Sequence, residues 1–468
     1  MRLTPKQENA KALAALLGIE EEDAAARLQL RIAVTFDCAS GADRELAEHV
    51  ITMLSRTVEW AGPSDGGPCA AEVILGSCPR ATSAASAIWA GQAGPDFVVD
   101  VRPHEARSAD EVPSPLRVVA ACYVAAAAVR AALGPDFPIW ATGPIVLRWS
   151  ELFGADTGIF RRPLDIGECY LAGAGAVGNG FLYTLRYFDL TGDMHVVDPK
   201  RVNAGGLNRC LLVNEDDIGH PKASCICQAA QNSFPKLRLI PKDIALADAR
   251  KERGGDFLIE RLIVAVDSRG TRRNLQSELP ERVFDASTTD IREVVLHFNR
   301  QPTDLACLSC VYPLNERERK HEENVAAALG LTLEEVRSTI CTPATAEKIC
   351  ERYPDAAAED LVGRAFDTVY KEFCGAGKLK ADGGQQVLAP FSFVSVLAGA
   401  LLAVEFVLRS AGDDDAARFN YWRLSPWHSP VPALRQHRLR DPHCEFCSKP
   451  VIRRELARIY GEPQALRA

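Results

Sequence analysis

A glycine-rich turn between a short apolar strand and an apolar helix is the feature that most constrains this chain. The strand is expected over residues 169–172, the glycine turn spans residues 173–178, and the helical pattern continues to Phe188. A second apolar strand, residues 195–197, leads directly to Asp198. This order of strand, glycine turn, helix, strand and acid predicts a nucleotide-binding βαβ unit in a mostly parallel α/β sheet.

The residue types in this unit suit a phosphate and a ribose. Gly173, Gly175 and Gly178 lack side chains, so the backbone can approach a phosphate, and the helix N-terminus offers free N–H groups to it. Asp198 is placed to accept hydrogen bonds from ribose hydroxyls. The alternative is a glycine-turned βαβ unit that binds nothing. We expect nucleotide binding.

A third apolar strand, residues 262–266, ends in Asp267. A carboxylate at the C-terminal end of a parallel strand faces the ligand crevice of an open α/β sheet. There it can hold Mg²⁺ on a triphosphate, because Mg²⁺ prefers one or two carboxylates together with phosphate oxygens. Asp267 can equally cap the N-terminus of the next helix, expected over residues 269–278. Both interpretations stay open.

Two cysteine pairs share one spacing, Cys307 with Cys310 and Cys444 with Cys447. Two intervening residues let both thiolates of a pair reach one ion, and two such pairs complete a tetrahedral Zn²⁺ site. A redox pair is the alternative, but two pairs favour metal. Four cysteines leave no open position, so the predicted zinc is structural, tying the C-terminal part to the sheet domain.

Composition narrows the classes of protein. The net charge of −8 argues against nucleic acid as a partner. No apolar run reaches membrane-spanning length without interruption, residues 392–408 being the closest, and the N-terminus lacks a signal-peptide apolar region. Fifteen cysteines, several in C-x-x-C pairs, suggest a reducing compartment. We therefore expect a cytoplasmic protein with no membrane partner.

The 468 residues suffice for two to three domains. We predict an N-terminal α/β domain (1–150), a nucleotide-binding domain (160–450) interrupted by an insert (312–388), and a C-terminal tail (451–468). The N-terminal domain lacks a glycine turn after its first strand, so it should bind nucleotide poorly, and it is either a divergent, inactive repeat or an unrelated recognition module.

Within the insert, Cys341 precedes a helix expected to begin at Pro343. A thiolate at that position is stabilised by free N–H groups and the helix dipole, which makes Cys341 the best nucleophile candidate. Cys374, on an expected loop, is the second candidate. An inert structural role is the more common one for any single cysteine.

Taken in order, these motifs resemble the adenylating domain shared by ubiquitin-activating enzymes and the bacterial MoeB and ThiF enzymes. The resemblance adds two motifs to those above: residues 207–209 (Leu-Asn-Arg) resemble the family's Asn-Leu-x-Arg, and residues 219–222 (Gly-His-Pro-Lys) resemble its Gly-x-Pro-Lys. It implies a Rossmann-like mixed sheet of the ThiF/MoeB type. The added N-terminal domain and the insert are more similar to an activating enzyme of a bacterial ubiquitin-like conjugation system than to a plain sulfur-transfer MoeB.

The resemblance also implies an activity. Arg209 and Lys222 would bind the ATP phosphates and Asp267 the Mg²⁺, while the C-terminal carboxylate of a small ubiquitin-like protein attacks the α-phosphate. Cys341 would then form a thioester and pass the carrier to a conjugating enzyme. Family members pair two such domains, so a homodimer is expected.

Departures from the family pattern lie around the same motifs. Gly206 stands where the family has asparagine, and Lys200 stands in place of a second acid. Asn203 is a candidate for the missing amide. The family also uses a partner arginine, and neither Arg161 nor Arg162 can be placed in that role from the sequence.

Three other functions stay open. Adenylation can serve sulfur transfer in cofactor biosynthesis without an enzyme thioester, which would make Cys341 dispensable. An NAD-dependent oxidoreductase explains the glycine turn and Asp198 but not Arg209, Lys222 and Asp267 together. A scaffold without catalytic activity would explain Lys200 and Gly206.

Overall fold

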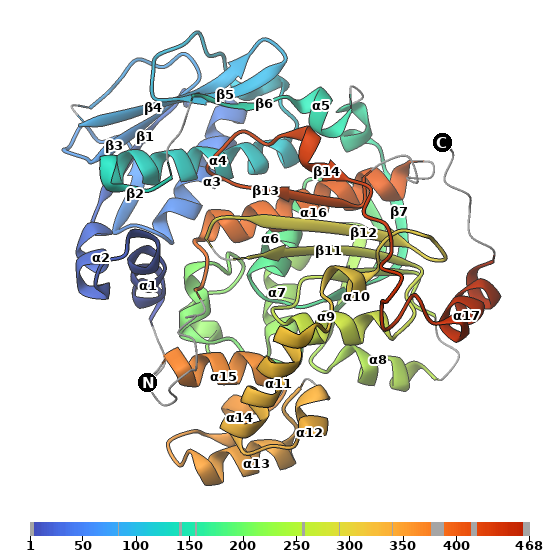
Figure 1. Ribbon diagram of the computed structural model, residues 1–468. Coiled ribbons are helices and arrows are strands. Elements are labelled where there is room, and N and C mark those ends of the chain that lie inside the picture. Colours follow the sequence, from blue (N-terminus) through green and yellow to red (C-terminus); the bar gives the residue numbers. More distant parts are fainter. Residues whose placement is uncertain are drawn as a thin grey trace.

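The computed structural model describes residues 4–82, 84–139, 143–154, 157–254, 258–289, 291–338, 340–375, 388–412 and 419–461. Within them the chain forms a six-stranded and an eight-stranded sheet (Figure 1). The N-terminal part comprises α1 (Pro5–Leu17), α2 (Glu21–Arg27), β1 (Arg31–Thr35), α3 (Gly41–Ser55), β2 (Trp60–Pro63), β3 (Ala71–Leu75), β4 (Ser86–Ala93), β5 (Asp96–Asp100), η1 (Ala109–Glu111), α4 (Ser114–Leu133), η2 (Gly134–Asp136) and β6 (Ile145–Leu147).

The second sheet and its helices follow two short connecting helices, α5 (Trp149–Phe153) and η3 (Thr157–Arg161). The elements up to the last long strand pair are β7 (Leu164–Ala172), α6 (Ala176–Leu185), β8 (Leu190–Val197), η4 (Ala204–Asn208), η5 (Glu215–Asp217), α7 (Lys222–Gln231), β9 (Leu237–Lys242), α8 (Leu246–Arg253), β10 (Arg261–Val264), α9 (Arg269–Gln276), β11 (Arg282–Thr288) and β12 (Val294–Arg300).

The helical insert lies between β12 and the C-terminal elements. The remaining elements are α10 (Leu308–Val311), α11 (Glu316–Leu329), α12 (Leu333–Arg337), α13 (Pro343–Arg352), α14 (Ala358–Leu361), α15 (Phe366–Gly375), α16 (Ser392–Ala411), β13 (Tyr421–Leu424), η7 (Pro432–Leu434), β14 (Arg435–Gln436) and α17 (Pro450–Tyr460). The predicted fold class, a mixed α/β sheet with a smaller N-terminal α/β domain, is confirmed.

The two sheets follow the same plan. The larger has the order β14-β13-β12-β11-β10-β7-β8-β9, in which β11 to β9 are parallel and β12 to β14 antiparallel. The smaller has the order β2-β1-β3-β4-β5-β6, with four parallel strands followed by β5 and β6 antiparallel. Thus β1-α3-β2 corresponds to β7-α6-β8, and α4 corresponds to α16. This topology favours a divergent repeat over an unrelated module for the N-terminal domain.

One hydrophobic core joins the two parts. Helix α16 packs on α6, β11 and β12, and it also contacts α4 and α3 of the N-terminal part. Figure 1 shows α4 and α16 lying between the two sheets. Glycines permit the closest approach, because a Cβ on Gly399 would lie 2.3 Å from the backbone nitrogen of Phe181 and one on Gly180 would lie 2.9 Å from the Cα of Val396.

Replacing Gly399 by alanine should therefore force α6 and α16 apart. We expect the free energy of unfolding to fall by about 1–3 kcal/mol, the usual cost of overpacking a dense core. Urea unfolding measures it. Gly41→Ala is the matched control, because nothing lies within 4 Å of a Cβ built on Gly41. Equal stability of the two variants would contradict the packing described here.

Two helices, α4 and α16, are long and apolar enough by length and composition to cross a membrane. The sequence had indicated no uninterrupted apolar run of that length, since Glu405 interrupts the longest candidate, residues 392–408. In the structure α16 is buried in the core, and Glu405 pairs with Arg409 one turn later, with Nε and Oε2 3.0 Å apart. Burial of this kind is the ordinary environment of an apolar helix packed between two sheets.

Candidate active site

The glycine turn adopts a conformation that its residue types require. Gly173 has a φ of 106°, and a Cβ there would lie 2.6 Å from the carbonyl oxygen of Ala265. A Cβ on Gly178 would lie 2.1 Å from the carbonyl oxygen of Gly173. Gly175 is the N-cap of α6 and no side chain caps this helix end. The open N–H groups of α6 therefore fit a phosphate.

Asp198 lies directly beside this turn. Its Oδ2 accepts a hydrogen bond from the backbone nitrogen of Ala174 at 2.8 Å, and its Oδ1 accepts one from that of Lys200 at 2.8 Å. The carboxylate thus fixes the glycine turn and the loop after β8 to each other. Each oxygen keeps a further lone pair, so the ribose role of Asp198 stays a prediction.

The loop after β8 carries the motif arginine and faces the motif lysine. The Nη1 of Arg209 donates to the carbonyl oxygen of Gly205 and to the Oδ1 of Asn208. Lys222 is half-buried at the first position of α7, and it forms no ion pair with the carboxylates of the described residues. Asn203 caps η4, its Oδ1 accepting from the backbone nitrogen of Gly206.

A small cavity of about 10 Å³ lies between these elements, lined by Ala174, Val202, Asn203, Gly206, Cys210, Val213 and Lys222. That is room for about one water molecule. A nucleotide would therefore need a shift of the η4 loop or of the insert, or it would lie largely outside this space. The lining places Lys222 and Asn203 at the same cavity as the glycine turn.

Asp267 lies at the end of the strand beyond the glycine turn and already has a cationic partner. Both of its carboxylate oxygens lie 2.8 Å from the Nζ of Lys200, and the hydroxyl of Thr368 on α15 donates to its Oδ2 at 3.1 Å. Desolvation acts to raise the pKa of Asp267, but the ammonium groups of Lys200 and then of Lys222 hold it well below its usual range.

This arrangement does not fit the Mg²⁺ role that the sequence suggested for Asp267. Mg²⁺ needs carboxylate oxygens free for coordination. Here the Lys200 ammonium lies 2.8 Å from both oxygens of Asp267, so a metal ion on their remaining lone pairs would lie close to a like charge. Lys200 itself stands where the resemblance places a second acid. The other suggestion, an N-cap, also does not hold, because Ser268 caps α9 with its hydroxyl.

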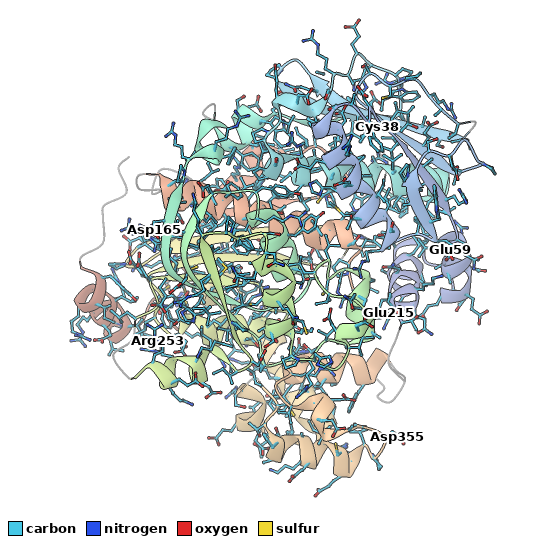
Figure 2. The ribbon with its side chains drawn as sticks, turned by 180° about the vertical axis from the view of Figure 1, so that it is seen from behind. Cys38, Glu59, Asp165, Glu215, Arg253 and Asp355 are labelled. Atoms are coloured by element: carbon cyan, nitrogen blue, oxygen red, sulfur yellow. The ribbon has the colours of Figure 1, made fainter. Side chains whose placement is uncertain are left out.

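The helical insert contacts the crevice at two points. Besides the Thr368–Asp267 hydrogen bond, Gly363 packs on Pro199, the residue after Asp198; a Cβ on Gly363 would lie 2.7 Å from the carbonyl oxygen of Pro199. Seen from behind in Figure 2, Glu215 marks the loop region between the N-terminal part and the insert, and Asp355 marks the insert.

Cys341 is tied to the same contact. Its backbone carbonyl accepts from the nitrogen of Gly363 at 2.8 Å, and its nitrogen donates to the carbonyl of Arg364 at 2.7 Å. As predicted, it directly precedes a capped helix, because Thr342 is the N-cap of α13. Gly363 therefore connects the two segments, because it hydrogen-bonds to Cys341 and packs on Pro199 in the loop after Asp198.

The Cys341 thiol is not in an activated state in this structure. It is 1% exposed and belongs to the core of the insert. Burial raises its pKa, although the hydroxyl of Thr345, which donates to Sγ at 3.5 Å, and the nearby Arg364 oppose the rise. Attack by its thiolate would require the insert to open. The side chain of the other candidate, Cys374, lies outside the described residues.

The four paired cysteines converge as predicted. Their sulfur atoms all lie within 4.8 Å of one another, with 3.8 Å between Cys307 and Cys310, 3.7 Å between Cys307 and Cys444, and 3.4 Å between Cys310 and Cys447. Zn–S bonds of about 2.3 Å in a tetrahedron separate sulfurs by roughly 3.8 Å. Backbone N–H groups of Asp441 and Phe446 also point at cluster sulfurs. This buried cluster could hold a structural zinc ion.

Loss of one zinc ligand should release the metal and loosen the C-terminal part. We expect Cys447→Ser to abolish equimolar zinc and to lower the free energy of unfolding by on the order of 3 kcal/mol or more, since metal binding contributes to folding. Elemental mass spectrometry and thermal unfolding measure the two effects. Cys350→Ser is the control, because Cys350 lies outside the cluster. Zinc retained by Cys447→Ser would contradict the assignment.

The corresponding helix N-terminus of the N-terminal repeat is occupied by acids. Asp43, near the start of α3, is buried and accepts from the backbone nitrogen of Ala109 at 2.8 Å, while Asp110 accepts from the N-cap hydroxyl of Ser40. Negative charge at this position repels phosphate. These acids are a physical reason to expect poor nucleotide binding by the N-terminal domain, which stays a prediction.

The N-terminal part instead hydrogen-bonds to the η4 segment of the larger part. The Nη1 of Arg56 donates to the carbonyl oxygen of Leu207 at 2.5 Å, and the side chain of Asn9 accepts from that of Asn208 at 2.8 Å. Neither Arg56 nor Asn9 could be found from the sequence, because neither belongs to a motif. Arg161 and Arg162 are exposed on the connection before β7, and no described contact places them at the site.

Comparison with known proteins agrees with the fold. Residues 156–446 match the ThiF family, and residues 3–153 match the E1 N-terminal domain. The chain belongs to the ThiF family, in the ubiquitin-activating and MoeB–ThiF group, as its motifs predicted.

Individual relatives cover less. An uncharacterized protein, y4jF, of Sinorhizobium fredii is 30% identical over 53% of this chain and 50% of its own length. A ubiquitin-activating enzyme E1-like protein of Saccharomyces cerevisiae is 31% identical over 17% of this chain and 12% of its own length. The yeast NEDD8-activating enzyme E1 catalytic subunit is 34% identical over 14% of this chain and 23% of its own length. The chain thus spans half or less of these relatives.

Among solved structures, E. coli MccB with ATP aligns over 64% of this chain and 71% of its own, with a TM-score of 0.37 and 15% identity. MccB with its MccA peptide aligns over 61% of this chain and 68% of its own, with a TM-score of 0.38 and 13% identity.

Proposed function

We propose that this chain adenylates the C-terminal carboxylate of a small ubiquitin-like protein with ATP. The observation that carries the proposal is the convergence on one crevice of an uncapped glycine turn, Asp198 and a half-buried Lys222 without a carboxylate partner among the described residues. Membership of the ThiF family supports an adenylating activity rather than NAD-dependent oxidation.

In the proposed first step, a carboxylate oxygen of the carrier attacks the α-phosphorus. A bond forms between that oxygen and phosphorus, the bond from phosphorus to the β-phosphate oxygen breaks, and pyrophosphate leaves. The chain's part is positioning and charge neutralisation. The N–H groups of α6 hold phosphate oxygens, Asp198 orients the ribose, and Lys222 and Arg209 neutralise charge that develops on the phosphates.

In the proposed second step, Cys341 attacks the acyl carbon of the adenylate. The C–S bond forms, the bond to the phosphate oxygen breaks, and AMP leaves. The thioester would then pass to the cysteine of a conjugating enzyme. Contact of the insert with Pro199 and Asp267 supports this role, since it brings the Cys341 segment next to the crevice.

One observation favours a second candidate. Burial and a raised pKa of Cys341 suit a protein that adenylates its carrier for sulfur transfer without an enzyme thioester. A non-reducing gel of this chain with ATP and a ubiquitin-like carrier distinguishes the two. We expect a band of combined mass that disappears with reductant. Adenylate formed without that band would favour sulfur transfer. Absence of both the adenylate and the band would overturn the proposal.

Domain boundaries and partners belong to the same proposal. The division at about residue 150, the insert and the C-terminal segment stay predictions, although the segment 451–468 begins inside helix α17. The expected homodimer also stays a prediction. Because the N-terminal repeat packs on α6 and α16, a single chain would supply both halves of a paired arrangement. Light scattering, which measures the molar mass in solution, would distinguish such a monomer from the expected homodimer.

A further inference from the structure

The ion pair between Lys200 and Asp267 spans the mouth of the glycine turn. Strand β7, which leads into that turn, lies between β8 and β10 in the sheet. Lys200 follows β8 and Asp267 follows β10, so their side chains meet across the end of β7 at 2.8 Å. A phosphate held by the α6 N-terminus would therefore lie beside the Lys200 ammonium.

The backbone holds Lys200 firmly in this position. Its nitrogen donates to the Oδ1 of Asp198 at 2.8 Å, and its carbonyl oxygen accepts from the nitrogen of Lys222 at 2.9 Å. Its side chain is only 18% exposed, whereas that of Asp267 is 51% exposed. An exposed surface ion pair would be weak and variable, but this lysine is anchored between two residues of the candidate nucleotide site.

We propose that Lys200 replaces the divalent cation at Asp267, so that this chain binds the ATP triphosphate without requiring Mg²⁺. The inference rests on the proposed ATP binding. A lysine held by both oxygens of one carboxylate supplies a fixed positive charge, and that charge repels a metal ion from the same oxygens. Lys222 lies on the same side of the crevice, so the phosphates would meet two ammonium groups.

The first test compares ATP affinity, by titration calorimetry, in EDTA and in excess Mg²⁺. Wild-type affinity should change less than about threefold between the two buffers, and in Lys200→Met affinity in EDTA should fall about tenfold or more and recover with Mg²⁺. Lys251→Met, an exposed lysine at 78%, is the control and should match the wild type. Wild-type ATP binding that is lost in EDTA would overturn the inference while leaving the proposed function intact.

A second test needs no nucleotide. Mn²⁺ titration followed by electron paramagnetic resonance should find the same number of bound ions in the wild type and in Asp267→Asn. Lys200→Met should gain one ion over the double variant Lys200→Met/Asp267→Asn. A manganese ion lost from the wild type on Asp267→Asn would show that Asp267 binds metal despite Lys200, which would overturn the inference even if ATP does not bind at all.

Discussion

Replacing Lys222 by alanine should lower the rate of carrier-dependent adenylation about 10²–10³-fold, the usual effect of removing one preorganised group that stabilises charge in the transition state. Lys222 begins α7, lines the cavity beside the glycine turn and forms no ion pair with the described carboxylates. Its charge is therefore available for a phosphate. The measurement is release of AMP and pyrophosphate under single-turnover conditions.

Two control variants separate this effect from a loss of fold. Lys251→Ala removes an exposed lysine of a local ion pair and should keep full activity. Lys222→Arg keeps the positive charge and should recover part of the rate. Unfolding of Lys222→Ala by heat should be close to that of the wild type, because Lys222 forms no ion pair with the described carboxylates and Lys200 remains the direct partner of Asp267. Full activity of Lys222→Ala would place the phosphates elsewhere.

Replacing Cys341 by alanine should abolish the reducible adduct with the carrier and leave adenylate formation unchanged. We expect the two effects to separate because Cys341 lies in the core of the insert, whereas the glycine turn and Lys222, which we propose bind the phosphates, lie at the sheet domain. Intact-protein mass spectrometry measures both products. Cys350→Ala, on the same helix α13, is the matched control. An adduct that survives in Cys341→Ala but not in Cys374→Ala would move the nucleophile to Cys374.

The same thiol predicts a pH dependence. Burial raises the pKa of Cys341, so the neutral thiol predominates at neutral pH and the thiolate fraction increases with pH. Attack requires the insert to open, and because the thiol is neutral before attack, thioester formation should rise about tenfold per pH unit below the ordinary thiol pKa. A rate independent of pH from 7 to 8 would mean that opening of the insert is rate-limiting.

Much of the fold followed from local patterns. Apolar runs and breakers located β10, β11 and α16 to within a few residues, whereas β7 and β8 each begin five residues earlier than expected. The capping box at Thr332 was expected at the start of α12 and Pro343 at the start of α13, but the cap at Thr342 was not. Strands β2, β4, β6, β9 and β14 were missed. β2 is four residues long and contains Gly62 and Pro63, and β4 is rich in small residues, so neither carries the β-branched pattern that marks a strand.

The parts of the site that could be predicted are those with a recognisable local spacing of residues. The glycine turn and the cysteine pairs have fixed spacings, and the structure brings each set together. Contacts between distant segments were not predictable. Lys200 and Asp267 are 67 residues apart, and Thr368 lies 101 residues beyond Asp267, so no spacing rule connects them. The predicted loop over 378–386 and the acidic run 413–415 lie outside the described residues.

The burial of Cys341 shows the same limit. Its place before a helix N-terminus was correct, but the sequence suggested a stabilised thiolate. Burial in the insert core outweighs the helix end, because withdrawal from water disfavours the charged form. The place of Cys341 before a helix predicts the effect of the helix dipole on its thiol. The side chains that bury this thiol come from α11, α14 and α15, which the local sequence does not reveal.

Exchange of labelled pyrophosphate into ATP tests the central claim most directly. The reaction contains this chain, ATP and a ubiquitin-like carrier, supplied either with a free C-terminal carboxylate or with that carboxylate amidated. Adenylation of the carboxylate predicts rapid exchange with the free carrier and background exchange with the amidated one. Exchange that is equal with both carriers, or absent with the free carrier while ATP is bound, would contradict it.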